Sequence, residues 1–320
     1  MILYKLATSM AVGLLTILSL VPLHAQDMSP SITVSGGFYP SQNLTDTTGS
    51  YSHQRAALGV TIPLLKKVKL NNDGLRFGLL SFSANTAIDN TDISFINGSR
   101  TLLMASASLT GIYKSGKKST WLGKLTGSSF EDETTVRHPT VRLSGFALYK
   151  RAVRESFYYL LGGAYTFSFG RGLALPVIGA GWSFTNRSSF SFVLPLSLNY
   201  RFGKTGSQYM LFLRPSGGIS GFYNNGLYPS ASEKIIFRKR EFTLGMHKKF
   251  KLSDHWSFFT EAGLLTARRI SFNKDLTRND DSVIFESKVH PGAYLSAGLK
   301  FKFNGKDIPD SDNNEYDLGF

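Results

Sequence analysis

Five histidines beyond residue 25 are the side chains that could move protons in a reaction: His53, His138, His247, His255 and His290. A histidine that acts as a general base must lie within hydrogen-bond reach of its nucleophile. His138 and His290 each precede a proline, which favours turns or strand starts, and the chain has no Gly-x-Ser-x-Gly motif. We therefore expect no catalytic residue and no enzyme. A hydrolase that uses one of these histidines is the less favoured alternative.

Metal chemistry has a superficial candidate near the C-terminus. The run Asp310-Ser-Asp-Asn-Asn-Glu315 is similar to the start of a calcium-binding loop, but it lacks the glycine at position six and the terminal glutamate of that motif. The chain contains no cysteine, which excludes disulfides, thiolate metal sites and a cysteine nucleophile. We expect no metal and no cofactor, and we interpret residues 304–320 as a flexible acidic tail.

Charged residues that alternate with apolar ones are more informative. If the apolar face of each segment meets lipid, the opposite face carries charges that we expect to line a lumen: Arg142, Lys150, Arg201, Arg214, Glu261, Arg269, Lys300 and Lys302. Facing lipid near the midplane, an Arg or Lys would cost about 2–4 kcal/mol. Two interpretations stay open. The charges pair with one another or with loops and fill a narrow lumen, or they form a basic lining that favours anions.

The segments that would hold these charges alternate with period two, as β-strands do. The clearest runs from Ser189 to Phe202, where one face is apolar and the other mostly polar or small. Its apolar face carries Phe190, Phe192, Leu194, Leu196, Leu198, Tyr200 and Phe202. The same split occurs in residues 156–169 and 293–303. Beyond residue 25 there is no stretch of about 18 apolar residues that would form a transmembrane helix.

Thirteen segments show strand character, and many are long enough to cross a membrane, which takes about 9–11 residues per strand. Short turns and longer polar joints separate them, and aromatic residues lie toward their ends. This pattern predicts a transmembrane antiparallel up-and-down β-barrel rather than a soluble all-β sandwich. Because single-chain barrels have even strand numbers, we predict twelve strands, within a range of ten to fourteen. The segments are 31–39, 53–62, 75–87, 101–113, 119–130, 140–150, 155–168, 174–184, 189–202, 208–222, 235–250, 255–270 and 284–303.

The N-terminus indicates export. Lys5, an apolar core at residues 11–23 and the small residue Ala25 form the pattern of a secretory signal peptide. We therefore divide the chain into a signal peptide at 1–25, a barrel at 26–303 and the tail at 304–320. The formal net charge is +14. The basic residues are scattered and the chain is exported, so we expect contact with anionic sugars or lipids and no binding of nucleic acid.

Three stretches carry a resemblance to a known family: Leu175-Pro-Val-Ile-Gly-Ala-Gly-Trp-Ser-Phe-Thr-Asn186, Phe192-Val-Leu-Pro-Leu196 and Tyr209-Met-Leu-Phe-Leu-Arg-Pro215. The chain resembles an uncharacterised family of outer-membrane β-barrels of the Bacteroidota type, classed as a domain of unknown function. The motifs are loose, although the likeness covers most of the chain beyond the signal peptide. The resemblance implies a barrel in the bacterial outer membrane, and it implies no catalytic residue and no substrate.

Three functions remain at this stage. A porin-like barrel would pass small, preferably anionic, solutes. A closed barrel would serve a structural or binding role in the envelope through its longer loops. An outer-membrane hydrolase is the least favoured. The partners we expect are outer-membrane lipid, lipopolysaccharide and the barrel-insertion machinery, and both monomers and trimers fit the pattern.

Overall fold

The computed structural model describes residues 30–303 except 72–73, 95–97, 117, 133–134, 186, 205–206, 225–232 and 275–281. The predicted signal peptide at 1–25 and the acidic tail at 304–320, with its calcium-like run, lie outside the described residues. In the described part of the chain, no helix is long and apolar enough to cross a membrane.

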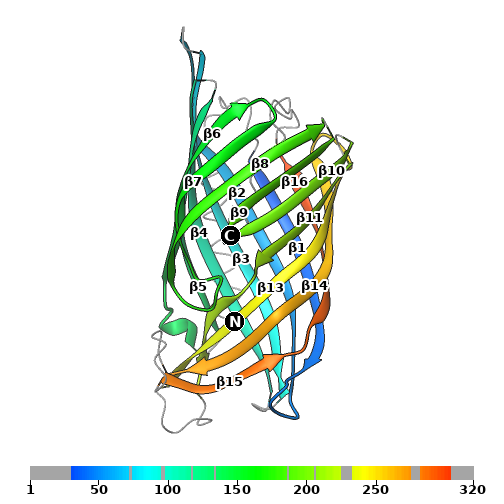
Figure 1. Ribbon diagram of the computed structural model, residues 1–320. Coiled ribbons are helices and arrows are strands. Elements are labelled where there is room, and N and C mark those ends of the chain that lie inside the picture. The colour runs from blue at the N-terminus through cyan, green and yellow to red at the C-terminus, as the bar shows by residue number, and fades with distance from the viewer. Residues whose placement is uncertain are drawn as a thin grey trace.

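Within the described residues, fourteen antiparallel strands form a closed circuit. Figure 1 shows the resulting barrel. Each strand pairs with the strands before and after it in the circuit, in which β13 follows β11 and β16 follows β14. Strand β1 pairs with β16 to complete the cylinder, with Ser31 opposite Lys302. The predicted fold class is therefore confirmed. The strands are β1 (Ser31–Asn43), β2 (Ser50–Asn71), β3 (Gly74–Ile93), β4 (Gly98–Ser115), β5 (Ser119–Asp132), β6 (Arg142–Arg154), β7 (Phe157–Thr166), β8 (Leu173–Thr185), β9 (Ser188–Leu194), β10 (Ser197–Lys204), β11 (Ser207–Pro215), β13 (Lys234–Lys251), β14 (Trp256–Asn273) and β16 (Gly292–Lys302).

The barrel has fourteen strands rather than the twelve we predicted. All thirteen predicted segments contribute to the barrel, and one of them supplies two strands. The segment 189–202 was predicted as one strand, but a tight turn at Pro195 and Leu196 divides it into β9 and β10. Two further segments are also divided. Residues 208–222 form β11 and β12 (Gly218–Tyr223), and residues 284–303 form β15 (Val283–Val289) and β16. Both β12 and β15 lie outside the fourteen-stranded circuit.

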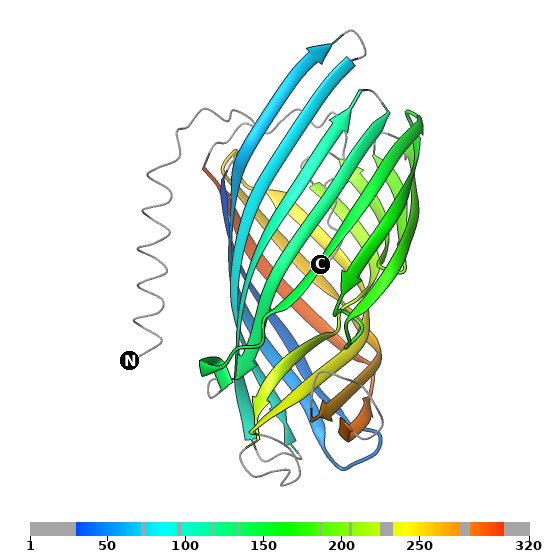
Figure 2. The same cartoon turned by 90° about the vertical axis from the view of Figure 1, so that its left-hand side faces the viewer.

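The two ends of the barrel differ. The turn end holds Ser31, Lys302 and short connections such as 155–156 and 252–255. The loop end holds the connections 44–49 and 167–172, the 3-10 helix η2 (Thr135–Arg137), β12 and β15. Figure 2 shows the hairpin of β2 and β3 rising above the rest of the rim at the turn end. The strands from β9 to β11 are short, with 7, 8 and 9 residues, whereas β2 has 22.

An apolar belt covers the outside of the barrel. Alternate residues of each strand expose large apolar side chains, although buried polar residues stand between them. Soluble proteins rarely expose so large a continuous apolar surface, whereas a membrane-spanning barrel needs one to face lipid. Members of the belt from successive strands are Val34, Leu58, Leu109, Leu125, Leu161, Ile178, Leu211, Leu244, Leu264 and Leu295.

Candidate functional site

The inward face of each strand follows from the alternation of exposure. In β16, the side chains of Leu295 and Leu299 are exposed on the outer surface, whereas Tyr294 points to the inside of the barrel and is buried. Lys300 shares the face of Tyr294 because side chains two residues apart point the same way, and it lies opposite Thr33 of β1. Applied to every strand, this alternation defines the surface of the lumen.

At the loop end the sheet closes a second, smaller circuit. Strand β12 pairs with β13 and meets β5 in a parallel bridge between Gly221 and Glu131, so it bypasses the six strands from β6 to β11. On the other side, β15 pairs with β14, and a bridge joins Val289 to Leu44 just beyond β1. Among the described residues this circuit has nine strands, β1–β5 and β12–β15.

A packed apolar cluster occupies the inside of the small circuit, and we call it the loop-end core. Its members are Leu44, Tyr51, Ile93, Leu102, Phe222, Ile235, Phe237, Ile270, Phe272 and Val289, each at most 5% exposed. The rings of Phe222, Phe237 and Phe272 contact one another, with centroids 5.1 to 5.7 Å apart. An apolar constriction of this kind excludes water and therefore ions.

A buried carboxylate holds the small circuit together. Glu131 of β5 is 0% exposed, and its oxygens lie 2.8 Å from Lys234 Nζ and 3.3 Å from a guanidinium nitrogen of Arg142. The backbone N–H of Thr140 also donates to it at 3.0 Å. Gly221 of β12 has no side chain at this point, and a Cβ there would overlap the Glu131 carboxylate. One acidic group therefore joins β5, β6, β12 and β13.

A layer of paired charges borders the loop-end core. Glu241 accepts from Arg268 Nε at 3.2 Å and lies 3.1 Å from Lys239 Nζ. The guanidinium of Arg268 lies 5.5 Å from the ring of Tyr51, a member of the core. The side chains of Glu241 and Arg268 are each only 2% exposed. Burying such charges is tolerable because each has an opposite partner.

A line of aromatic and charged side chains follows the inner wall next to this layer, and we call it the aromatic line. The ring of Tyr39 stacks on His53, with centroids 3.7 Å apart, and on Tyr294, at 5.5 Å. The hydroxyl of Tyr294 donates to Glu261 at 2.8 Å. Glu261 in turn accepts from Arg214 at 3.0 Å. These contacts run across five strands, from β2 through β1, β16 and β14 to β11.

The turn end of the lumen is basic. In the strand halves that adjoin the short turns, the inward faces carry Lys114, Lys124, Lys150, Arg201, Lys249, Lys300 and Lys302. Among the described inward residues of these halves, Glu261 is the acidic member, and Arg214 and His247 lie 3.0 and 3.8 Å from its oxygens. We call this set the basic vestibule. It gives the wide part of the lumen an excess of positive charge.

One side of the lumen wall is apolar. The inward faces of β5 to β9 and the β9–β10 turn contribute a second cluster, with Leu148 at 0% and Leu160 at 1% exposed. The cluster consists of Leu122, Leu148, Leu160, Ala164, Val177, Val193 and Leu196. The wall of the lumen therefore combines a basic rim with an apolar panel.

A family model described as a domain of unknown function, DUF6268, matches residues 23–302. The chain belongs to this family. No curated protein matches the DUF6268 chain. The prediction that the chain belongs to an uncharacterised family, classed as a domain of unknown function, is therefore confirmed.

Solved barrels resemble the DUF6268 chain at low identity. A porin, KdgM in complex with disordered oligogalacturonate, is 6% identical with a TM-score of 0.36, covering 85% of this chain and 99% of that one. An outer membrane channel from Pseudomonas putida F1 is 9% identical with a TM-score of 0.41, covering 88% and 100%. The transport unit of the autotransporter AIDA-I from Escherichia coli is 12% identical with a TM-score of 0.30, covering 89% and 93%.

The structure distributes the predicted lumen-lining residues over three places. Arg142 is buried against Glu131 beside the small circuit. Arg214 and Glu261 pair in the aromatic line. Lys150, Arg201, Lys300 and Lys302 lie on the inward faces of the basic vestibule, where Lys150 Nζ stands 4.1 Å from the centre of the Tyr158 ring. Their role as a lining for anions stays a prediction.

Arg269 lies elsewhere because β14 contains a bulge. Phe242 of β13 faces Thr266, but Arg240 faces Arg269, so β14 carries one extra residue between these pairs. Ala267 has a φ of 48° at this point. Beyond the bulge the even-numbered side chains turn inward, and Arg269 points outward. The alternation that predicted a lumen position for Arg269 does not continue past the bulge.

The sequence interpretation missed the buried charges at the loop end, although a signal for them exists. Residues 238–241 read Arg-Lys-Arg-Glu, four charged residues in succession inside β13. Such a run cannot alternate between lipid and lumen, so a break in the regular wall could have been expected there. Of the histidines, His53 stacks in the aromatic line, His247 approaches Glu261, and His255 Nδ1 lies 2.9 Å from the carbonyl of Lys302.

Proposed function

We propose that this DUF6268 protein is a bacterial outer-membrane barrel whose lumen admits small anionic solutes from the turn end and whose loop end is shut at rest by the loop-end core. The observation that carries the proposal is the contrast along the inward faces. The wide part is basic, and the narrow part is filled with apolar side chains. The proposal assigns no enzymatic step.

The outer surface supports this location. A closed circuit of strands satisfies every backbone hydrogen bond inside the wall, which is the condition for strands in a bilayer. In outer-membrane barrels the short turns face the periplasm and the longer loops face outward, so the basic vestibule would open to the periplasm. Assembly there needs the barrel-insertion machinery, and a Bacteroidota-type envelope stays a prediction from the sequence.

Electrostatics supports anions as the solutes. The vestibule places lysine and arginine on at least six inward strand faces, and a positive lining in a confined, low-dielectric wall lowers the barrier for anions and raises it for cations. The charges are distributed over six strands of the wall. They therefore favour small hydrated anions in general over one tightly bound ligand.

Closure at the loop end makes the barrel a gated conduit. An ion that crossed the loop-end core would lose its hydration among the rings of Phe222, Phe237 and Phe272, and these rings offer no polar atom in its place. Passage therefore requires the core to separate. We expect β12 to move in this step, because it carries Phe222 and meets β5 only through a bridge at Gly221 in the described residues.

The test is planar-bilayer recording of the refolded chain, compared with the double variant Phe222→Ala/Phe272→Ala. We expect the unchanged protein to show no steady current and the double variant to show anion-selective steps. The matched control is Phe38→Ala, which removes the same ring from the outward face of β1, where Phe38 is 51% exposed; this variant should stay silent. Folding of each variant is checked by its heat-dependent gel mobility.

Two outcomes would contradict the proposal. Steady steps from the unchanged protein would mean that the loop end is open at rest. Silence from a folded core variant would mean that the lumen is not a conduit.

The second outcome would favour a closed barrel with a structural or binding role. The observation on its side is the extent of apolar packing inside the wall, since both the loop-end core and the panel on β5–β9 are buried. The recording separates the two candidates, because a barrel built only as a scaffold has no conductance for the core to hold back.

A further inference from the structure

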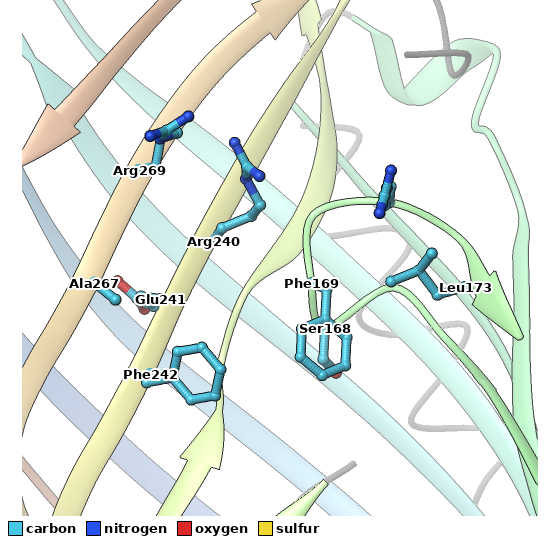
Figure 3. A pocket seen from close by; sticks show the side chains of 9 residues that line it. Ser168, Phe169, Leu173, Arg240, Glu241, Phe242, Ala267 and Arg269 are labelled. Atoms are coloured by element: carbon cyan, nitrogen blue, oxygen red, sulfur yellow. The ribbon is translucent and has the colours of Figure 1, made fainter. Parts of the chain in front are cut away.

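A cleft opens on the outside of the barrel at the loop end. Here β13 and β14 extend beyond the ends of their neighbours β11 and β16. Its volume is about 420 Å³. Figure 3 shows the connection between β7 and β8 facing the two taller strands across it. The cleft is lined by Ser168, Phe169, Arg171, Leu173, Arg240, Glu241, Phe242, Ala267 and Arg269.

The cleft is held in shape by contacts on both sides. On one side the carbonyl of Gly170 accepts from the buried guanidinium of Arg238 at 3.1 Å. Gly170 has a φ of +72°, and a Cβ there would meet the Arg240 side chain, so the connection approaches β13 only because this residue is glycine. On the other side the bulge at Ala267 turns Arg269 outward.

The charge of the cleft is positive. Arg171, Arg240 and Arg269 surround it, and Glu286 of β15 lies against Arg240 and Arg269, 3.1 Å from the latter. Glu241 also borders the cleft, but Lys239 and Arg268 already pair with it. Guanidinium groups are suited to phosphate oxygens, because each can donate two parallel N–H bonds to them.

The floor of the cleft is apolar and continues into the belt. The rings of Phe169 and Phe242 are arranged edge to face, with their centroids 6.4 Å apart. Leu244 is the next outward residue of β13 from Phe242 toward the turn end. Leu244 and its partner Leu264 on β14 are each 50% exposed. A ligand that occupied the arginines could therefore extend its apolar part along the wall.

We propose that this cleft binds the phosphate of an anionic outer-leaflet lipid, with acyl chains along Leu244 and Leu264. The inference rests on the proposed outer-membrane location, which places the loop end in the outward leaflet. A cleft that faces outward, combines three arginines with two phenyl rings and borders the apolar belt matches a phosphorylated amphiphile more closely than it matches a soluble anion.

The experiment measures binding of diphosphoryl lipid A to the full chain in detergent by native mass spectrometry. The test variant is Arg240→Gln/Arg269→Gln. The control is Arg151→Gln, an exposed outward arginine near the opposite end of the barrel, in β6. We expect the double variant to bind at least about tenfold more weakly, because each lost charge-assisted contact contributes that much, and the control to bind as the unchanged protein does.

Dephosphorylated lipid A and inorganic phosphate complete the design. Equal binding of the double variant, or equal binding of the dephosphorylated lipid, would overturn the proposal. Displacement of the lipid by millimolar inorganic phosphate would show that the cleft binds the free anion. Because the cleft is outside the lumen, adding Arg240→Gln/Arg269→Gln to the Phe222→Ala/Phe272→Ala background should leave the anion-selective steps unchanged. Failure here and failure of the gated conduit are therefore separate results.

Discussion

The two ends of this barrel use the same strands for opposite purposes. At the turn end, fourteen strands enclose a lumen whose inward faces carry lysine and arginine. At the loop end, nine strands enclose a packed core. The difference follows from circumference, because a barrel of about eight strands is just wide enough for its own side chains to fill, whereas larger barrels leave a channel. A six-residue strand, β12, makes that difference by joining β13 to β5.

The two ends also differ in how much each residue matters. The small circuit depends on contacts that are buried and specific, with Glu131 at 0% exposed between two cations. The vestibule, by contrast, would act through the summed field of charges that are distributed over several strands. Substitutions at the loop end should therefore change stability, and substitutions at the turn end should change ion preference.

Replacing Glu131 by alanine should have the largest effect. The substitution leaves Arg142, whose side chain is 4% exposed, without its buried carboxylate, and removal of one partner from a buried pair typically costs about 4 kcal/mol. Urea unfolding in lipid vesicles would measure this loss. Glu155→Ala, at an exposed turn, is the control and should change stability by less than about 0.5 kcal/mol. A similar small change in both would show that the carboxylate does not hold the small circuit.

Replacing Phe272 by alanine should cost about 3 kcal/mol, the low end of the range for a buried ring. Phe272 is 0% exposed, and its neighbours Phe222 and Phe237 can partly close the gap. The same unfolding measurement applies, with Phe38→Ala as the lipid-facing control. If both variants lost the same free energy, the loop-end core would be no better packed than the outer belt.

Replacing Gly221 by alanine should cost about 2 kcal/mol, within the range for overpacking a buried site. The added Cβ would displace the Glu131 carboxylate from the point where β12 meets β5. Gly218→Ala is the control on the same strand, because a Cβ at Gly218 meets nothing within 4 Å. A double-mutant cycle with Glu131→Ala should show that the two effects overlap. Simple addition would mean that Gly221 acts elsewhere.

The sequence predicted the large circuit well because alternation is a local property. It failed where a change of direction leaves alternation intact. In the β9–β10 hairpin Phe192 lies opposite Leu198 and Phe190 opposite Tyr200. Both members of each pair are even-numbered, so the apolar face continues through the turn, and 189–202 reads as a single strand.

The small circuit could not be predicted for a different reason. The register of β14 depends on a bulge, and one extra residue reverses the face of every later side chain, which is why Arg269 was placed in the lumen. The bridges from β12 to β5 and from β15 to Leu44 join residues far apart in the chain. No period in a single sequence carries such pairings, so the vestibule charges were foreseen in part and the loop-end core was not.

Replacing Lys300 and Lys302 together by glutamine should have the smallest effect on the fold and a specific effect on ion preference. Neither charge has a place in the small circuit, so stability should change by less than about 0.5 kcal/mol. In the Phe222→Ala/Phe272→Ala background, the chloride-to-potassium permeability ratio should fall about twofold or more, since two positive charges leave a confined lumen. Raising the salt concentration should shrink the difference, because screening weakens the field of the remaining lysines.

The control is Lys118→Gln/Arg151→Gln in the same background, which removes two exposed charges outside the lumen at the same end. An equal fall in the control would assign selectivity to the net charge of the rim. A fall confined to Lys300 and Lys302 would assign it to the lining and complete the division between a loop end that closes the barrel and a turn end that selects what enters it.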